Sequence, residues 1–126
     1  MKPLPRTQFG NPILRRKAKR VVLKELHKPA LKILIQDMFA TIQDIGVGLA
    51  APQVGKSIQL AVIDVHALSH RPKVSPYKQV IINPKIVAYS KNRESDYEGC
   101  LSCDGLRGKV PRSKEVTVEY YDEKGN

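Results

Sequence analysis

The sequence predicts a single α+β domain, with one helix near the N-terminus followed by antiparallel strands. Apolar residues recur at helical spacing between residues 31 and 45, and three later segments are rich in β-branched and aromatic residues. A chain of 126 residues is long enough to bury a core of its own. We therefore expect residues 1–126 to form one domain.

The predicted helix buries one apolar stripe. The stripe consists of Leu31, Leu34, Ile35, Met38, Ile42 and Ile45. Pro29 suits the first turn, where its missing N–H costs nothing, and Gly46 suits the C-cap. We expect a helix between these two residues, with its Met and Phe side chains in the core.

The predicted strands follow the helix. Residues 59–65 and 80–82 are apolar and β-rich, Asn83-Pro84 should break the second strand, and residues 86–89 should resume it. Residues 115–121 alternate as a strand does. The polar segments 66–76 and 91–96 should be loop and turn.

The last five residues, 122–126, have the composition of a hairpin turn with Gly125-Asn126 at its tip. Such a turn is normally followed by a further strand, and an apolar edge strand without a partner is prone to aggregation. We therefore expect the domain to be incomplete at its C-terminus, with strand 116–121 lacking its partner.

Charge and cysteine content restrict the class of protein. The net charge is +10, and residues 1–24 contain no acidic residue. The default interpretation is a solvated basic face, although such a face also attracts polyanions such as RNA or the ribosome. No apolar run is long enough for a membrane helix or a signal peptide, and two cysteines make no disulfide framework. We expect a cytoplasmic protein with no membrane partner and no specific DNA target.

Two motifs carry the chemistry. The first is Gly46-Val47-Gly48-Leu49-Ala50-Ala51-Pro52-Gln53, in which glycines admit a close backbone and Gln53 offers an amide donor. The second is Glu98-Gly99-Cys100-Leu101-Ser102, which places a potential metal-binding thiolate beside a carboxylate. Taken alone, Gln53 would more often be a surface residue and Cys100 a small buried one.

Together and in this order, the two motifs resemble those of the peptide deformylase family. The resemblance extends to the opening segment Gly10-Asn11-Pro12-Ile13-Leu14-Arg15, to the Asn-Pro strand break and to the run from Cys103 to Arg112. Cys103 departs from the pattern, because an apolar residue usually follows the serine. The family's third motif, His-Glu-x-x-His, does not occur in the 126 residues, so we expect a chain truncated before the metal-binding helix.

The resemblance implies a role for each matching residue. Cys100 would be a metal ligand, and Gln53 with the N–H of Leu101 would form the oxyanion hole. The substrate would lie along Gly46, Val47, Gly48, Glu98, Gly99 and Arg107. Arg112 is a candidate structural partner for Glu98.

The resemblance also implies a reaction. Deformylases remove the formyl group from formyl-methionyl nascent peptides by means of a divalent metal, Fe²⁺ first, with Zn²⁺ or Ni²⁺ as substitutes. The two histidines of the third motif complete the metal site and its glutamate acts as general acid and base. The activity of these 126 residues alone is doubtful on this basis.

Two other interpretations use the same residues. Cys100 and Cys103 form a C-x-x-C pair that could hold zinc with His66 and His70, which have i, i+4 spacing. A redox role for that pair requires a helix start, whereas Asp104-Gly105 favours a turn. Alternatively, the chain is an inactive deformylase-like fragment or a basic RNA-binding module, although it has few aromatic residues for stacking on bases.

Overall fold

The computed structural model describes residues 1–67 and 72–126. Its regular elements are the 3-10 helices η1 (Pro12–Leu14), η2 (Leu23–Glu25) and η3 (Ala51–Val54), the helix α1 (Pro29–Ile42), and the strands β1 (Gly48–Ala50), β2 (Leu60–Val65), β3 (Tyr77–Tyr89), β4 (Arg93–Cys100), β5 (Cys103–Ser113) and β6 (Val116–Tyr121).

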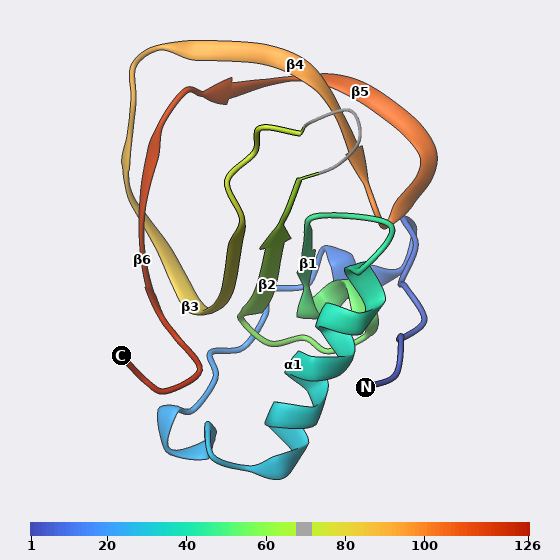
Figure 1. Cartoon of the computed structure of the whole chain (residues 1–126), viewed down its shortest axis with the longest axis vertical. Helices are drawn as coiled ribbons and strands as arrows, with labels where there is room; N and C mark the ends of the chain where they lie inside the picture. Colours follow the sequence, from blue (N-terminus) through green and yellow to red (C-terminus); the bar gives the residue numbers. More distant parts are fainter. Residues whose placement is uncertain (68–71) are drawn as a thin grey trace.

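The strands form two sheets, and every paired strand is antiparallel. One sheet has four strands in the order β1-β2-β3-β6, and the other is the β4–β5 hairpin. Figure 1 shows this hairpin as a long curved ribbon at the top of the view, with α1 beside β1 and β2 below it. The predicted α+β class with one N-terminal helix is confirmed.

Helix α1 packs one apolar face on the first two strands. Ile35, Met38 and Ile42 are buried with Leu49 of β1 and with residues of β2 and β3. Phe39, expected in the core, is only half-buried, and the ammonium of Lys78 lies 4.5 Å from the centre of its ring. Burial of these side chains is the main force that holds the helix in place.

The helix ends earlier than predicted. Gln43, and not Gly46, is its C-cap, and Ile45 lies beyond the helix with about half of its surface exposed (51%). The expected stripe is therefore wrong at its last member. Locally, the N–H groups of Ile45 and Gly46 both bond to the Ile42 carbonyl, which closes the last turn of the helix.

Asn83-Pro84 does not break the third strand as predicted. β3 runs through both residues, and its register against β6 shifts between Ile82 and Lys85. Asn83 takes the left-handed conformation, with φ 51°. Its buried side chain accepts from the Val21 N–H at 2.8 Å and donates to the Val21 carbonyl at 2.9 Å, so the bulge holds the N-terminal segment against the sheet.

Strands β4 and β5 were missed. The segment predicted as a turn, residues 91–96, contains the start of β4 at Arg93, and the predicted turn at Asp104-Gly105 lies inside β5. The hairpin turns instead at Leu101-Ser102. Most side chains of this hairpin are exposed, so it is held mainly by backbone hydrogen bonds. Its sequence therefore lacks the apolar pattern that predicts a buried strand.

Strand β6 is confirmed, and the further strand expected to pair with it after the turn is not among the described strands. β6 pairs with β3 on one side and lies at the end of the strand order on the other. The predicted turn follows it: Asp122 accepts from the N–H groups of Lys124 and Asn126, and Gly125 has φ 87°. These hydrogen bonds, led by that from Asn126, lower the pKa of Asp122.

No helix among residues 1–67 and 72–126 is long and apolar enough to cross a membrane. Of the predicted loop 66–76, residues 68–71 lie outside the described part of the chain.

Candidate active-site cleft

The two motifs lie on the walls of one cleft of about 750 Å³. The first motif contributes Gly46, Val47, Gly48 and Gln53, and the second contributes Gly99, Cys100 and Leu101. Arg107 also lines the cleft. Eight of the nine residues singled out from the sequence are thus brought together, although they are up to 61 positions apart in the chain.

Gln53 is held by the short helix η3. Its side-chain oxygen accepts from the Ala50 N–H at 2.9 Å, an arrangement that caps the first turn. The amide nitrogen then points toward the second motif, 3.1 Å from Ser102 Oγ and 3.5 Å from Cys100 Sγ. A donor fixed in this way loses little freedom when it binds a ligand atom beside the sulfur.

Cys100 lies at the tip of the β4–β5 hairpin. It is the last residue of β4, Cys103 is the first of β5, and the two are paired across the turn. Both cysteines line the cleft as free thiols; Cys100 is exposed and Cys103 is half-buried. The buried hydroxyl of Ser102 between them anchors the turn to Gln53.

The glycines of the first motif have different surroundings. A Cβ atom placed on Gly46 would lie 3.0 Å from a methyl group of Leu101, so Gly46 makes room for the second motif. Gly48 begins β1, which pairs only with β2 among the described strands. The other edge of β1 is therefore open to an extended chain in the cleft.

Glu98 is the one candidate that does not line the cleft. Its carboxylate forms a two-fold hydrogen-bonded pair with Arg112, at 3.0 Å from Nε and 2.8 Å from Nη2. The expected pairing of these residues is confirmed. The hydrogen bonds from Arg112 lower the pKa of Glu98, and the carboxylate in turn raises the pKa of Arg112.

A strap of N-terminal residues, 6–9, joins the two motifs and was missed from the sequence. The Thr7 N–H donates to the Gln53 carbonyl at 2.6 Å, and the Phe9 N–H donates to the Ser102 carbonyl at 2.7 Å. Arg6 donates to the Leu101 carbonyl and pairs with Asp104 at 2.6 Å. Its charge had been assigned to a solvated face, and no sequence pattern marks Arg6 as different from its basic neighbours.

The side chains present fit only part of a metal site. Cys100 offers one thiol in the cleft, and His66 lines the same cleft. Within residues 1–67 and 72–126, no three His, Cys, Asp or Glu side chains group as a metal site would require. His70, the remaining member of the alternative zinc set, lies outside the described residues.

The C-x-x-C pair closes a hairpin and does not start a helix, which removes the geometric basis for a thioredoxin-like interpretation.

Comparison with known proteins agrees with this geometry. The sequence model of the family described as polypeptide deformylase matches residues 4–126. Peptide deformylase 2 of Nostoc sp. is 42% identical over 98% of this chain and 69% of its own length. The peptide deformylases of Leptospira biflexa and Chlorobaculum tepidum are 40% and 42% identical, and the chain spans 66% and 62% of their lengths.

Solved structures give the same answer. A class I type b peptide deformylase from Acinetobacter baumannii, with Met-Ala-Ser bound, has a TM-score of 0.90 at 33% identity, covering 98% of this chain and 79% of that one. The peptide deformylase of Thermotoga maritima has a TM-score of 0.83 at 35% identity, covering 100% and 78%. The match runs through both cleft motifs, and the chain belongs to the polypeptide deformylase family.

Proposed function

We propose that this chain supplies the oxyanion-binding and peptide-binding parts of a deformylase site that hydrolyses the N-formyl group of formyl-methionyl peptides. The observation that carries the proposal is the position of Gln53. Its amide nitrogen lies in the cleft within 3.5 Å of Cys100 Sγ, the atom that the family resemblance assigns to the metal.

The amide of Gln53 acts on the formyl oxygen. As water adds to the formyl carbon, negative charge develops on this oxygen, and a fixed N–H donor stabilises the charge. The backbone N–H of Leu101, next to Cys100 at the hairpin tip, is the proposed second donor. Arg6 and Gln8 both donate to the Leu101 carbonyl, at 2.8 and 3.1 Å, and so hold this peptide unit in one orientation.

The peptide lies along the open edge of β1. Gly46, Val47 and Gly48 offer backbone groups on one wall, while Gly99 and Arg107 are paired across the hairpin on the other. The bound Met-Ala-Ser of the Acinetobacter baumannii protein is a peptide of the kind this cleft would take. Arg107 has no ion pair among the described residues and could meet the peptide's carboxylate or carbonyl groups.

Cys100 is the proposed ligand of one divalent metal, Fe²⁺ in the cell, with Zn²⁺ or Ni²⁺ as substitutes. When bound, such an ion lowers the pKa of water and polarises the formyl group. Because the described residues supply one ligand, we expect the 126-residue chain to bind metal weakly, to lose it to chelators and to deformylate a formyl-Met peptide negligibly. Elemental analysis before and after chelation checks the first point.

The test of Gln53 uses the chain extended by a C-terminal segment that carries His-Glu-x-x-His. We expect Gln53→Ala to lower turnover about 10²–10³-fold with metal content unchanged, as for loss of one oxyanion donor. Cys100→Ala should lose both metal and activity. Gln79→Ala, a β3 glutamine outside the cleft, is the matched control. An extended protein indifferent to both cleft substitutions would refute the assignment of the site.

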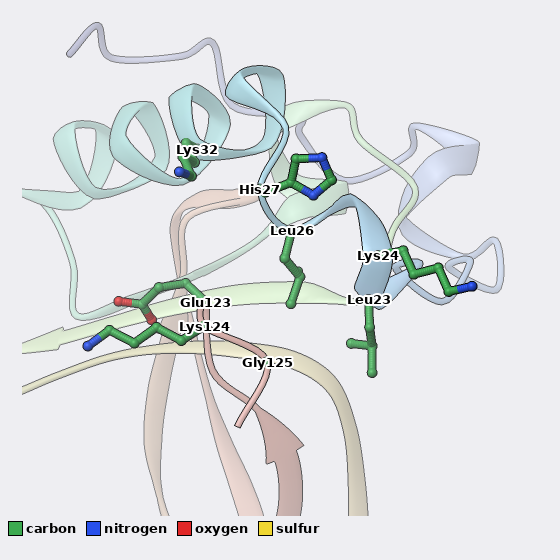
Figure 2. A pocket seen from close by; sticks show the side chains of 8 residues that line it. All are labelled: Leu23, Lys24, Leu26, His27, Lys32, Glu123, Lys124 and Gly125. Atoms are coloured by element: carbon green, nitrogen blue, oxygen red, sulfur yellow. The ribbon is translucent and has the colours of Figure 1, made fainter.

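A basic hollow favours a second role, contact with ribosomal RNA in the cytoplasm. It is lined by Leu23, Lys24, Leu26, His27, Lys32, Glu123, Lys124 and Gly125 and shares no residue with the first cleft. In Figure 2, Lys24 lies on η2, Lys32 on α1, and Glu123 and Lys124 at the C-terminal turn, with Leu26 between them. Within the described part of the chain, none of the three lysines has an ion-pair partner, so all three are free for phosphates.

This role predicts salt-dependent binding to RNA. The double variant Lys24→Ala, Lys32→Ala should weaken binding to an RNA duplex and lower the slope of log K against log salt by about 2, one for each phosphate contact. The double variant Lys17→Ala, Lys91→Ala, which removes two exposed lysines outside the hollow, is the control. Equal slopes for both variants would show that net charge alone attracts RNA.

A further inference from the structure

Cys100 and Cys103 face each other across the tip of the β4–β5 hairpin. They are Cα partners with two residues between them, next to a register shift between Gly99 and Cys100 that sets them apart from the regular ladder below. Partners in an antiparallel pair lie about 4.5–5.5 Å apart between Cα atoms and point their side chains to the same face. Disulfide-bonded cysteines have Cα separations of about 4.4–6.8 Å. The strand pairing therefore supplies the spacing that a disulfide requires.

Both thiols are open to the same solvent space. Cys100 is exposed, Cys103 is half-buried, and both line the cleft of about 750 Å³. A small oxidant that enters the cleft reaches either sulfur. The turn between them is anchored by Gln53 and by the 6–9 strap through Ser102 and Leu101, which holds the ends of the two paired strands in place.

We propose that Cys100 and Cys103 form a reversible intrachain disulfide when the protein meets hydrogen peroxide, and that this bond withdraws Cys100 from metal binding. The loss of metal binding rests on the proposed function, in which Cys100 is a metal ligand. The formation of the disulfide rests only on the geometry of the hairpin.

The chemistry balances with peroxide as the oxidant. The Cys100 thiolate attacks one peroxide oxygen, the O–O bond breaks, and the departing hydroxide takes a proton to become water. This leaves a sulfenic acid on Cys100. The Cys103 thiolate then attacks that sulfur, the S–S bond forms, and hydroxide leaves as a second water. Two thiols are oxidised and one peroxide is reduced, and a dithiol reductant reverses the step by exchange.

The disulfide would act as a switch because the sulfur of Cys100 cannot bind a metal while it is bonded to Cys103. The thiolate is the form of cysteine that binds a metal, and a sulfur in a disulfide no longer has that charge. Cys103 also protects the site, since it converts the sulfenic acid to a reducible disulfide before further oxidation to the irreversible acids.

The first experiment treats the reduced 126-residue chain with an equal amount of hydrogen peroxide and maps the peptides by mass spectrometry. The expected product is a monomer whose Cys100–Cys103 peptide has lost two thiol hydrogens and regains them with dithiothreitol. In Cys103→Ser, oxidation should stop at a Cys100 sulfenic acid that dimedone traps. Disulfide-linked dimers, or Cys100 sulfinic acid in the unsubstituted chain, would overturn the proposal.

A second experiment separates this proposal from the proposed function. In Cys103→Ser, the rate at which iodoacetamide alkylates Cys100 is measured with and without excess Zn²⁺. Slower alkylation with Zn²⁺ supports Cys100 as a ligand and hence the switch. An unchanged rate, with the disulfide still formed in the unsubstituted chain, would overturn the switch and the assignment of Cys100 while leaving the disulfide established.

Discussion

Glu98 illustrates how one side chain can serve a cleft that it does not line. Its carboxylate is turned to Arg112 on the neighbouring strand, and this pair connects the middle of β4 to the end of β5. The next residue, Gly99, and then Cys100 are lining residues. The pair therefore positions the backbone that presents the thiol. Arg112 could be named as its candidate partner from the family resemblance, since opposite charge alone does not select one of the 22 basic residues.

The lowered pKa of Glu98 predicts an effect of pH on the hairpin. A carboxyl group whose folded pKa lies below its unfolded value stabilises the fold above the unfolded pKa, and this stabilisation is lost as the pH falls through the folded pKa. Arg112→Ala should therefore raise the pKa of Glu98 toward its ordinary value, as measured by carbon NMR of the carboxyl group.

Lys114→Ala is the matched control for this titration, because Lys114 belongs to the same hairpin region but pairs with Glu94 at 3.6 Å. It should leave the pKa of Glu98 unchanged. Equal pKa values for Glu98 with and without Arg112 would mean that the pair does not persist in solution.

At the scale of elements, the sequence predicted the segments that carry an apolar or alternating pattern and missed those whose only support is backbone pairing. α1, β2 and β6 carry a periodic apolar pattern and were found. β4 and β5 contain mostly exposed polar residues, two glycines and a proline after position 103, so their composition is that of a loop. The cleft motifs were found through their resemblance to a known family and not from periodicity, and the strap of residues 6–9 has no comparable signal.

The bulge at Asn83 is an element-scale feature with a measurable contribution. Asn83→Ala leaves the N–H and carbonyl of Val21 without their buried partners and places alanine at φ 51°. We expect the free energy of unfolding to fall by about 2–3 kcal/mol, measured by urea denaturation.

Asn83→Gly distinguishes the two contributions, because glycine adopts a positive φ without strain. If the hydrogen bonds dominate, the glycine variant should lose most of the same stability. A glycine variant as stable as the unsubstituted chain would show instead that conformation alone accounts for the loss.

At the scale of the whole molecule, the apolar side chains are buried in one part and exposed in another. α1, β1 and β2 enclose the core together with part of β3, whereas the second half of β3 and the paired β6 leave large apolar side chains exposed. These exposed residues are Ile86, Val87, Tyr89, Val116 and Tyr121. Figure 1 shows β6 running beside the second half of β3 at the left of the view. An apolar strand at the end of a sheet is a surface on which other chains can pair.

We therefore predict that the 126-residue chain self-associates through β6, even though β6 has one partner within the chain. Sedimentation velocity should show a weight-average mass that rises with concentration. Val116→Lys, which puts a charge on the exposed end of β6, should reduce this association because a charged edge disfavours pairing. Lys85→Val is a contrasting variant on β3 and should increase it. A monomer at every concentration, unchanged by either substitution, would show that this edge is already protected in solution.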